Sequence, residues 1–252
     1  MEFKSGPIKI QVGAAAPTPR DAEADRAQLQ AIQARLTAGD LEGAAELART
    51  ALAGGLEHPL TFNLTAGMLE ADDRFAESVS VLQRGHRAFP QDPGLTQALG
   101  LGLFRLQRFA EALPHFDAMT AAQPGFAQAH AARGAVLDAL GRDPEAEAAY
   151  RRALDLQGDN LLALAGLAGT AARAGRHDEA RRCAEQVLAA EPGYPEAVMA
   201  LARADLAEGY YDDGVARLEA LIADPRASDP QRDVARELIA DITAARTRKF
   251  DA

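Results

Sequence analysis

The chain has little cysteine or lysine, no tryptophan and no long apolar run. Its 252 residues include one cysteine, Cys183, and three lysines, Lys4, Lys9 and Lys249. A single cysteine excludes an internal disulfide, and Cys183 fits best as a small core thiol. No apolar stretch reaches the ~18–20 residues that span a bilayer, and the N-terminus lacks a signal-peptide core. We therefore expect a cytoplasmic protein without a membrane span.

The charge of the chain is strongly acidic. The formal net charge is −10, and arginine supplies nearly all of the positive charge. An acidic chain without a basic run is a poor electrostatic match for nucleic acid or for an anionic membrane. We therefore expect neither as a partner. Abundant alanine and arginine with so little lysine is typical of a GC-rich bacterial source.

Helix-breaking residues recur at a fixed spacing. Pro90, Pro124 and Pro192 fall in one 34-residue register, and Gly158 occupies the slot between the last two. A breaker at this period is typical of arrays of helical hairpins. The register divides the chain into six blocks: 25–58, 59–92, 93–126, 127–160, 161–194 and 195–228.

Each block reads as two short helices. Two windows per block place alanine or apolar residues at helical spacing, and turn signals such as Gly39-Asp40 and Gly175-Arg176 separate them. Such a hairpin cannot bury its apolar face alone, so stacking predicts an all-α solenoid. Position 20 of the blocks is always small, as a close helix crossing requires: Ala44, Ser78, Ala112, Ala146, Ala180 and Gly214.

The pattern resembles the tetratricopeptide repeat (TPR) family. Residues 74–78 (RFAES) and 108–112 (RFAEA) are similar to the family's turn into its second helix, and the resemblance covers roughly residues 25–228. The family's aromatic residue at position 4 survives only as Phe62. The resemblance implies a right-handed α-solenoid of about six units between residues 21 and 228, and a protein that binds other proteins.

The two ends depart from the repeat. Residues 1–20 have linker composition, and we expect either a flexible leader or cloning remnant, or a segment that docks in a groove of its own or a neighbouring chain. Residues 231–246 predict an amphipathic helix. Residues 248–252 resemble the turn at 108–112, so the segment 229–252 is either a capping helix or a truncated further repeat. The expected apolar stripe is Val234, Leu238, Ile239 and Ile242.

The sequence shows no catalytic or metal-binding motif. Gly100 and Gly102 begin like a dinucleotide-binding loop, but the third glycine is replaced by Arg105 and no strand precedes, so both glycines fit close helix packing better. No two histidines are three or four residues apart; His115 and His130 could meet only across blocks. We therefore expect no enzyme activity in this chain, no catalytic residue, no cofactor and no metal.

The resemblance implies a concave groove lined by the first helix of each block. An apolar strip around Phe104 would anchor a partner peptide or helix, unless it is ordinary packing between repeats. Arginines along the groove would hold carboxylates, unless they form internal ion pairs, and small residues would leave room for a thick ligand. Asn63 and Gln97 would pair with a bound backbone. The predicted partner-binding residues are Leu60, Asn63, Leu64, Gln97, Leu101, Phe104, Arg105, Ala131, Asp138, Arg173 and Arg203.

One known specificity of the family is not supported. The members that bind chaperone tails use a clamp of lysines and asparagines for the terminal carboxylate. None of the matching slots here holds either residue: they are Leu29, Gln33, Leu64, Gly94 and Ala98.

Three functions remain open at this stage. The first is a non-enzymatic interaction module whose groove binds a peptide or helix. The second is the substrate-recruiting part of a larger bacterial sulfotransferase or glycosyltransferase, because residues 190–197 (AEPGYPEA) look similar to TPR proteins with such a domain. The third is an assembly factor for a secretion, pilus or flagellar system.

Overall fold

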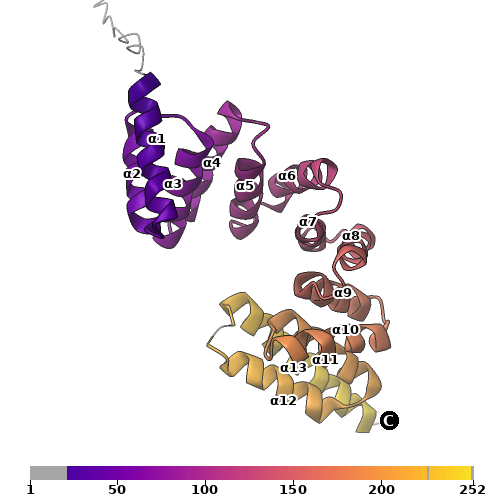
Figure 1. Cartoon of the computed structure of the whole chain (residues 1–252). Helices are drawn as coiled ribbons and strands as arrows, with labels where there is room; N and C mark the ends of the chain where they lie inside the picture. Colours follow the sequence, from indigo (N-terminus) through magenta and orange to yellow (C-terminus); the bar gives the residue numbers. More distant parts are fainter. Residues whose placement is uncertain (1–21, 226, 251–252) are drawn as a thin grey trace, which may run out of the picture.

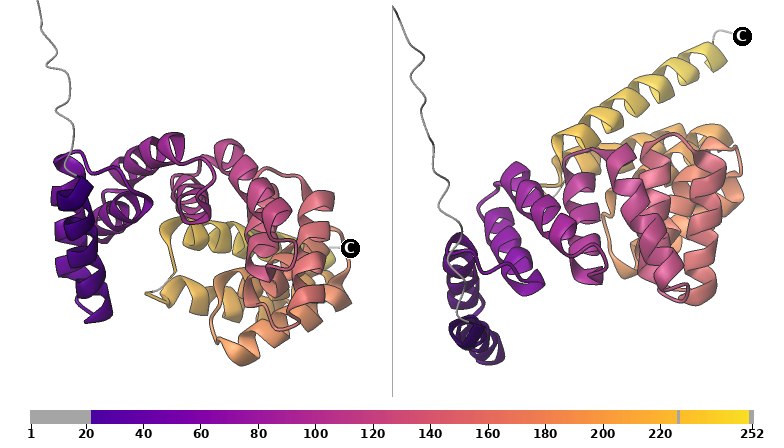
Figure 2. Two further views of the ribbon diagram at one scale, coloured as in Figure 1. Left: turned by 45° about the horizontal axis from the view of Figure 1, so that its top comes forward. Right: turned by 90° about the horizontal axis from the view of Figure 1, so that it is seen from above.

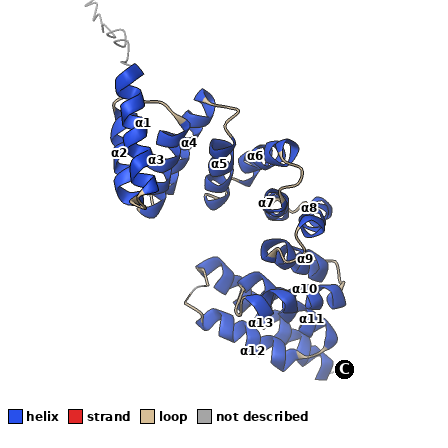
Figure 3. Ribbon diagram, viewed as in Figure 1, coloured by secondary structure: helices blue, strands red, loops and turns tan. Residues whose placement is uncertain are grey.

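The computed structural model describes residues 22–225 and 227–250, and the only regular secondary structure in this part of the chain is α-helix, joined by turns and loops (Figures 1 and 3). The predicted all-α repeat solenoid is therefore confirmed. The possible docking of residues 1–20 lies outside the described residues. Among the helices described, none is both long enough and apolar enough to cross a membrane.

The helices follow one another as antiparallel pairs joined by short turns. They are α1 (Ala22–Thr37), α2 (Leu41–Ala53), α3 (Pro59–Ala71), α4 (Phe75–Ala88), α5 (Pro93–Arg105), α6 (Phe109–Ala122), α7 (Ala127–Ala139), α8 (Asp143–Leu156), α9 (Leu161–Arg173), α10 (His177–Ala190), α11 (Pro195–Glu208), α12 (Tyr211–Ala223) and α13 (Asp229–Phe250). The pairs stack along an arc that runs from α1 to α13 (Figures 1 and 2).

Local sequence sets the ends of these helices. The Asp92 side chain accepts a hydrogen bond from the Leu95 N–H at the start of α5, and the Asn160 side chain caps α9 in the same way. Such caps satisfy backbone donors that the helix itself leaves free. Gly141 and Gly175 adopt positive φ (70° and 74°) in the turns within two pairs, a conformation that costs glycine least.

Stacking buries the small residues at position 20 and brings aromatic rings against glycines. Ala44, Ser78, Ala112, Ala146, Ala180 and Gly214 are all buried. A Cβ added at Gly85 would lie 2.8 Å from the Phe62 ring, and one added at Gly100 would lie 3.2 Å from the Phe116 ring. Gly100 therefore serves helix packing, as predicted, because a larger residue there would push the ring away.

Helix α13 packs on α12 and α11, as the first helix of a further pair would. The predicted apolar stripe is confirmed, since Leu238 and Ile242 are buried and Val234 and Ile239 pack against the same cluster. Helix α13 continues without a break through residues 248–250. The described part of this stretch is therefore helix and not a turn, while residues 251 and 252 lie outside the described residues. A capping helix and a truncated further repeat both stay predictions.

The histidines on the second helices meet differently from the expectation. His115 on α6 contacts His86 on α4, with ring centroids 5.0 Å apart, whereas His130 Nε2 lies 3.0 Å from the Pro124 carbonyl oxygen. The possible approach of His115 to His130 is not seen, because His115 instead meets His86, and α4 and α6 occupy equivalent places in neighbouring pairs. Burial, and secondly the neighbouring His86, lower the pKa of the His115 imidazole.

We expect the His115 ring to titrate below the ordinary value of about 6.5. The folded state then binds fewer protons than the unfolded state, so the free energy of unfolding falls as pH decreases below that value. NMR titration of the His115 ring protons measures the midpoint. His86 and His115 line a surface hollow together with the charged residues Arg87 and Glu111, which the variant His86→Gln leaves unchanged. That variant should raise the midpoint only in part, since burial is the larger cause. A midpoint at or above 6.5 contradicts the prediction.

Candidate functional site

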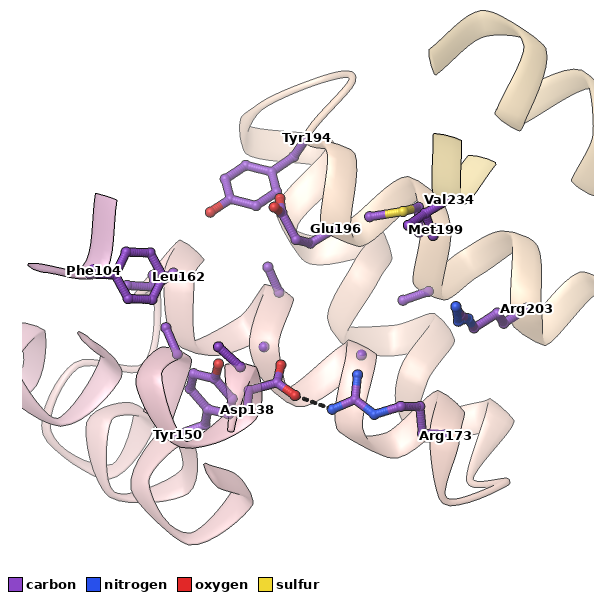
Figure 4. Close-up of a pocket in the computed structure, with 16 residues that line it drawn as sticks. Phe104, Asp138, Tyr150, Leu162, Arg173, Tyr194, Glu196, Met199, Arg203 and Val234 are labelled. Carbon is purple, nitrogen blue, oxygen red and sulfur yellow. Dashed lines mark hydrogen bonds and ion pairs between the residues drawn. The ribbon is translucent and has the colours of Figure 1, made fainter. Parts of the chain in front are cut away.

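A pocket of about 490 Å³ lies on one face of the array and falls in the size range of about 300–1,000 Å³ that ligand sites occupy (Figure 4). Its lining comes mainly from the first helix of each pair, from α5 to α13, which places it on the inner face of the solenoid. The lining residues are Phe104, Ala135, Asp138, Ala139, Tyr150, Leu162, Ala165, Gly166, Gly169, Arg173, Tyr194, Glu196, Met199, Ala200, Arg203 and Val234.

Arg173 on α9 is tied to two carboxylates. Its Nη2 donates to Asp138 on α7 (Figure 4). The same Nη2 donates over 2.9 Å to Asp143 at the start of α8. Burial raises the pKa of the Asp138 carboxyl, and the Arg173 charge opposes that shift. Because each acid comes from a different helix, the ion pairs fix α7, α8 and α9 relative to one another.

Arg203 on α11 is different, because the described residues offer it neither a hydrogen bond nor an ion pair. Its side chain is half-buried and reaches into the pocket on the same side as Arg173 (Figure 4). Burial, and secondly the Arg173 charge, lower the pKa of the Arg203 guanidinium. The charge of Asp241 on α13 opposes this shift from beyond ion-pair distance, so the charged form is only partly compensated.

Tyr150 forms the floor of the pocket from helix α8. The ring is only 2% exposed and fits a slot between glycines: a Cβ at Gly134 would lie 2.6 Å from it, and one at Gly166 would lie 2.1 Å from it. The hydroxyl has no hydrogen-bond partner among the described residues, and burial raises its pKa above the ordinary value. It therefore stays protonated and available as a donor.

The remaining walls are largely apolar. Phe104 lies at the end of the pocket opposite Arg203, and its ring meets Phe109 edge to face with centroids 5.3 Å apart (Figure 4). Leu162 and Met199 line the stretch between these ends. Tyr194 and Glu196 form another edge, where the Glu196 carboxylate accepts a hydrogen bond of 3.0 Å from the Gln231 amide.

The structure brings four of the predicted residues together in this pocket: Phe104, Asp138, Arg173 and Arg203. It does not bring the predicted apolar strip together. Leu60 and Leu64 pack against the cluster around Ile32 near the N-terminal end, whereas Leu101 is 44% exposed outside the pocket. A partner role for these three leucines stays a prediction.

Three polar residues of the predicted set lie elsewhere. Arg105 donates to Glu70 over 3.1 Å and stacks over the Phe75 ring, so it forms the alternative internal pair. Gln97 lines a smaller hollow beside Phe126. Asn63 faces Gly94 at the next pair of helices. Their predicted contacts with a bound backbone or carboxylate remain untested.

Ala131 requires a correction. It has no exposed surface, because it is packed in the cluster around Tyr150 and Ala146. A partner in the groove cannot contact it in this arrangement, and its small size instead permits close packing of α7.

Sequence reasoning did not include Tyr150, Tyr194 or Val234 in the site. Tyr150 falls at a repeat position that normally packs between helices, and Val234 belongs to the apolar stripe of α13. The only available signal for Tyr150 was the pair of glycines, Gly134 and Gly166, in neighbouring blocks. Tyr194 lies in a connection and carries no periodic signal.

No group of three or more histidine, cysteine, aspartate or glutamate side chains in the described ranges is arranged to hold a metal ion. The pocket combines apolar walls, a tyrosine hydroxyl donor and an arginine that forms no ion pair with the described residues.

Profiles of the tetratricopeptide repeat match most of the chain. One matches residues 29–93 and 98–160, and another matches residues 171–242. No curated protein matches the sequence.

Several solved structures share the fold. A thermophilic TPR protein from Thermus thermophilus, TTC0263, is 19% identical, with a TM-score of 0.58 over 73% of this chain and 100% of that one. A double mutant of MamA RS-1 is also 19% identical, with a TM-score of 0.58 over 66% of this chain and 93% of the other. MamA residues 41 to the end, from Desulfovibrio magneticus RS-1, is 20% identical, with a TM-score of 0.54 over 64% and 90%.

Proposed function

Since this chain belongs to the tetratricopeptide repeat family, we propose that it is a protein-interaction module whose inner-face pocket binds a segment of a partner protein. The observation that carries the proposal is the pocket between Phe104 and Arg203, where apolar walls meet two polar groups, the Arg203 guanidinium and the Tyr150 hydroxyl, that form no hydrogen bond with the described residues. Solenoids of stacked helix pairs offer extended concave surfaces of this kind for binding.

The composition of the pocket suits an anchor residue. Interface energy concentrates in a few side chains that fill well-packed, desolvated pockets. Phe104, Leu162 and Met199 supply apolar surface for such an anchor, and a volume of about 490 Å³ accommodates partner side chains rather than a whole folded domain. The backbone of the bound segment would then run along the inner face.

Recruitment of substrate for a larger sulfotransferase or glycosyltransferase, and assembly of a secretion, pilus or flagellar system, differ from this proposal only in the identity of the partner. Each would use the same inner face. A test of the pocket therefore applies to all three, and no feature of the described residues favours either specialised role.

The test is a selection of 16-residue peptides displayed on phage against the immobilised protein, followed by titration of synthetic peptides. Ala139→Trp places a large ring at an exposed pocket position, and Ala121→Trp makes the same change at an exposed alanine in the last turn of α6, outside the pocket. We expect Ala139→Trp to weaken peptide binding about tenfold or more, a loss of about 1.4 kcal/mol. Ala121→Trp should change it little.

Circular dichroism of both variants controls for the fold. If selected peptides bind Ala139→Trp as tightly as the parent, the working surface lies elsewhere and the proposal is wrong. Failure to select any peptide also contradicts it.

A further inference from the structure

Arg203 is the cation of the pocket for which the described residues supply no hydrogen bond and no ion pair, although the charge of Asp241 on α13 acts on it from beyond ion-pair distance. Arg173 has Asp138 and Asp143, and Arg105 has Glu70, whereas Arg203 has no ion-pair partner among the described residues. Half-buried charges are costly unless they are paired, so an anion brought by a ligand would gain more here than at an exposed arginine.

The pocket also orients such an anion. Glu196 precedes Arg203 by seven residues on α11, which is about 10 Å along the helix at about 1.5 Å per residue. A carboxylate carried by the ligand would be repelled by Glu196 and attracted to Arg203, and would therefore bind near Arg203. At the far side, Phe104 offers an aromatic face with no charge of its own (Figure 4).

Resting on the function proposed above, we propose that the bound segment carries an acidic side chain that pairs with Arg203, beside an apolar side chain that packs toward Phe104. An arginine fork and a carboxylate match in geometry, and two parallel hydrogen bonds add specificity to the charge attraction. The Tyr150 hydroxyl supplies a further donor on the pocket floor, which a carboxylate or a backbone carbonyl can accept.

Local charge rather than overall charge must carry this preference. With a net charge of −10 the protein repels an acidic peptide at long range, so any acidic preference has to come from groups that touch the peptide. A preference for acidic over neutral peptides would therefore report on direct contact with Arg203. Its chemistry differs from the family's terminal-carboxylate clamp, whose positions hold no lysine or asparagine in this chain.

The experiment uses the full chain and peptides from the phage selection, synthesised with an amidated C-terminus so that only side chains supply carboxylates. Each peptide is compared with its analogue in which glutamate or aspartate is replaced by the corresponding amide. We expect the parent protein to prefer the acidic peptide about ten- to a hundredfold, as a charge-assisted bond in a partly desolvated site would give.

Two arginine variants locate the preference. Arg203→Gln should reduce it to less than about threefold. Arg152→Gln changes the net charge equally at an exposed arginine on α8 outside the pocket, and it should leave the preference intact. Because Arg203 makes no internal ion pair in the described part of the chain, its replacement should not lower the thermal midpoint, which checks that the fold survives.

The outcomes separate this inference from the proposed function. If peptides bind in a way that Ala139→Trp abolishes, but acidic and amide forms bind equally, the module stands and the acidic partner is overturned. The acidic partner is also overturned if Arg203→Gln keeps the preference or if Arg152→Gln removes it. Loss of the preference in Arg203→Gln alone supports the inference.

Discussion

Replacing Asp205 with alanine is expected to destabilise the C-terminal half of the array by up to about 3–5 kcal/mol, the cost of removing one partner from a fully buried ion pair, because its two arginine partners are themselves partly exposed. The carboxylate on α11 is 2% exposed and receives Arg181 of α10 over 2.8 Å and Arg217 of α12 over 3.1 Å. Its loss would leave both guanidinium groups without this acceptor where the three helices meet. Urea unfolding followed by circular dichroism measures the change.

The control is Glu185→Ala on α10, which removes an exposed acid that forms no ion pair among the described residues. It should change stability by no more than about 0.5 kcal/mol. Arg217→Ala should cost less than Asp205→Ala, because Asp205 keeps Arg181 and Arg181 keeps Glu208. If Asp205→Ala behaves like the control, the cost of burying the carboxylate offsets its attractions.

Replacing Tyr150 with alanine is expected to cost a similar amount, about 3–5 kcal/mol, because the change leaves a cavity where the ring now fills the slot in α7 and α9. Tyr150→Phe keeps the ring and removes only a hydroxyl that forms no hydrogen bond with the described residues, so it should be nearly neutral in stability. Hydrogen exchange should accompany the unfolding curve, because neighbouring repeats of a solenoid can open separately.

Alanine substitutions at two glycines on α9 test the packing of the Tyr150 ring, and they are expected to change the free energy of unfolding in opposite directions. Alanine at Gly166 would bring its Cβ to 2.1 Å from the Tyr150 ring, and overpacking of this kind costs about 1–3 kcal/mol. Alanine at Gly169 would meet nothing closer than 3.6 Å and should stabilise the helix by up to about 1 kcal/mol. In a Tyr150→Ala background, Gly166→Ala should become neutral or stabilising. If Gly166→Ala and Gly169→Ala destabilise the protein equally, the claim that the Tyr150 ring fills a slot against Gly166 is wrong.

Much of the architecture could be predicted from the sequence, because breakers, small residues and apolar residues recur in it at regular spacings. The 34-residue register places a breaker after each pair of helices, and small residues at position 20 recur where the helices cross. The role of Gly100 also followed, since a glycine without a preceding strand cannot form a nucleotide loop. The helix spacing depends on neighbours within a block and the register on comparison of blocks within the same chain, so one sequence suffices to detect them.

The site was only partly accessible. Phe104, Asp138, Arg173 and Arg203 were found because the family resemblance says which positions face inward. The repeat register does not show whether each charged residue forms an ion pair within the protein. Arg173 and Arg203 both face inward, yet among the described residues only Arg173 forms ion pairs, at distances fixed by how α7, α8 and α9 stack. The charge of Asp241 acts on Arg203 only from beyond ion-pair distance.

The sequence by itself determined that this protein is a stack of helix pairs with an inner face, because repeat period, helix spacing and turn residues are properties of local segments. Only the tertiary structure decided which inner-face residues share a pocket, that Ala131 is buried, that Tyr150 lies beneath the pocket and that Arg203 lacks an ion-pair partner among the described residues. The physical reason is that these outcomes depend on the curvature of the array. Small rotations between successive pairs accumulate, and they set distances between side chains that are a repeat or more apart in the chain.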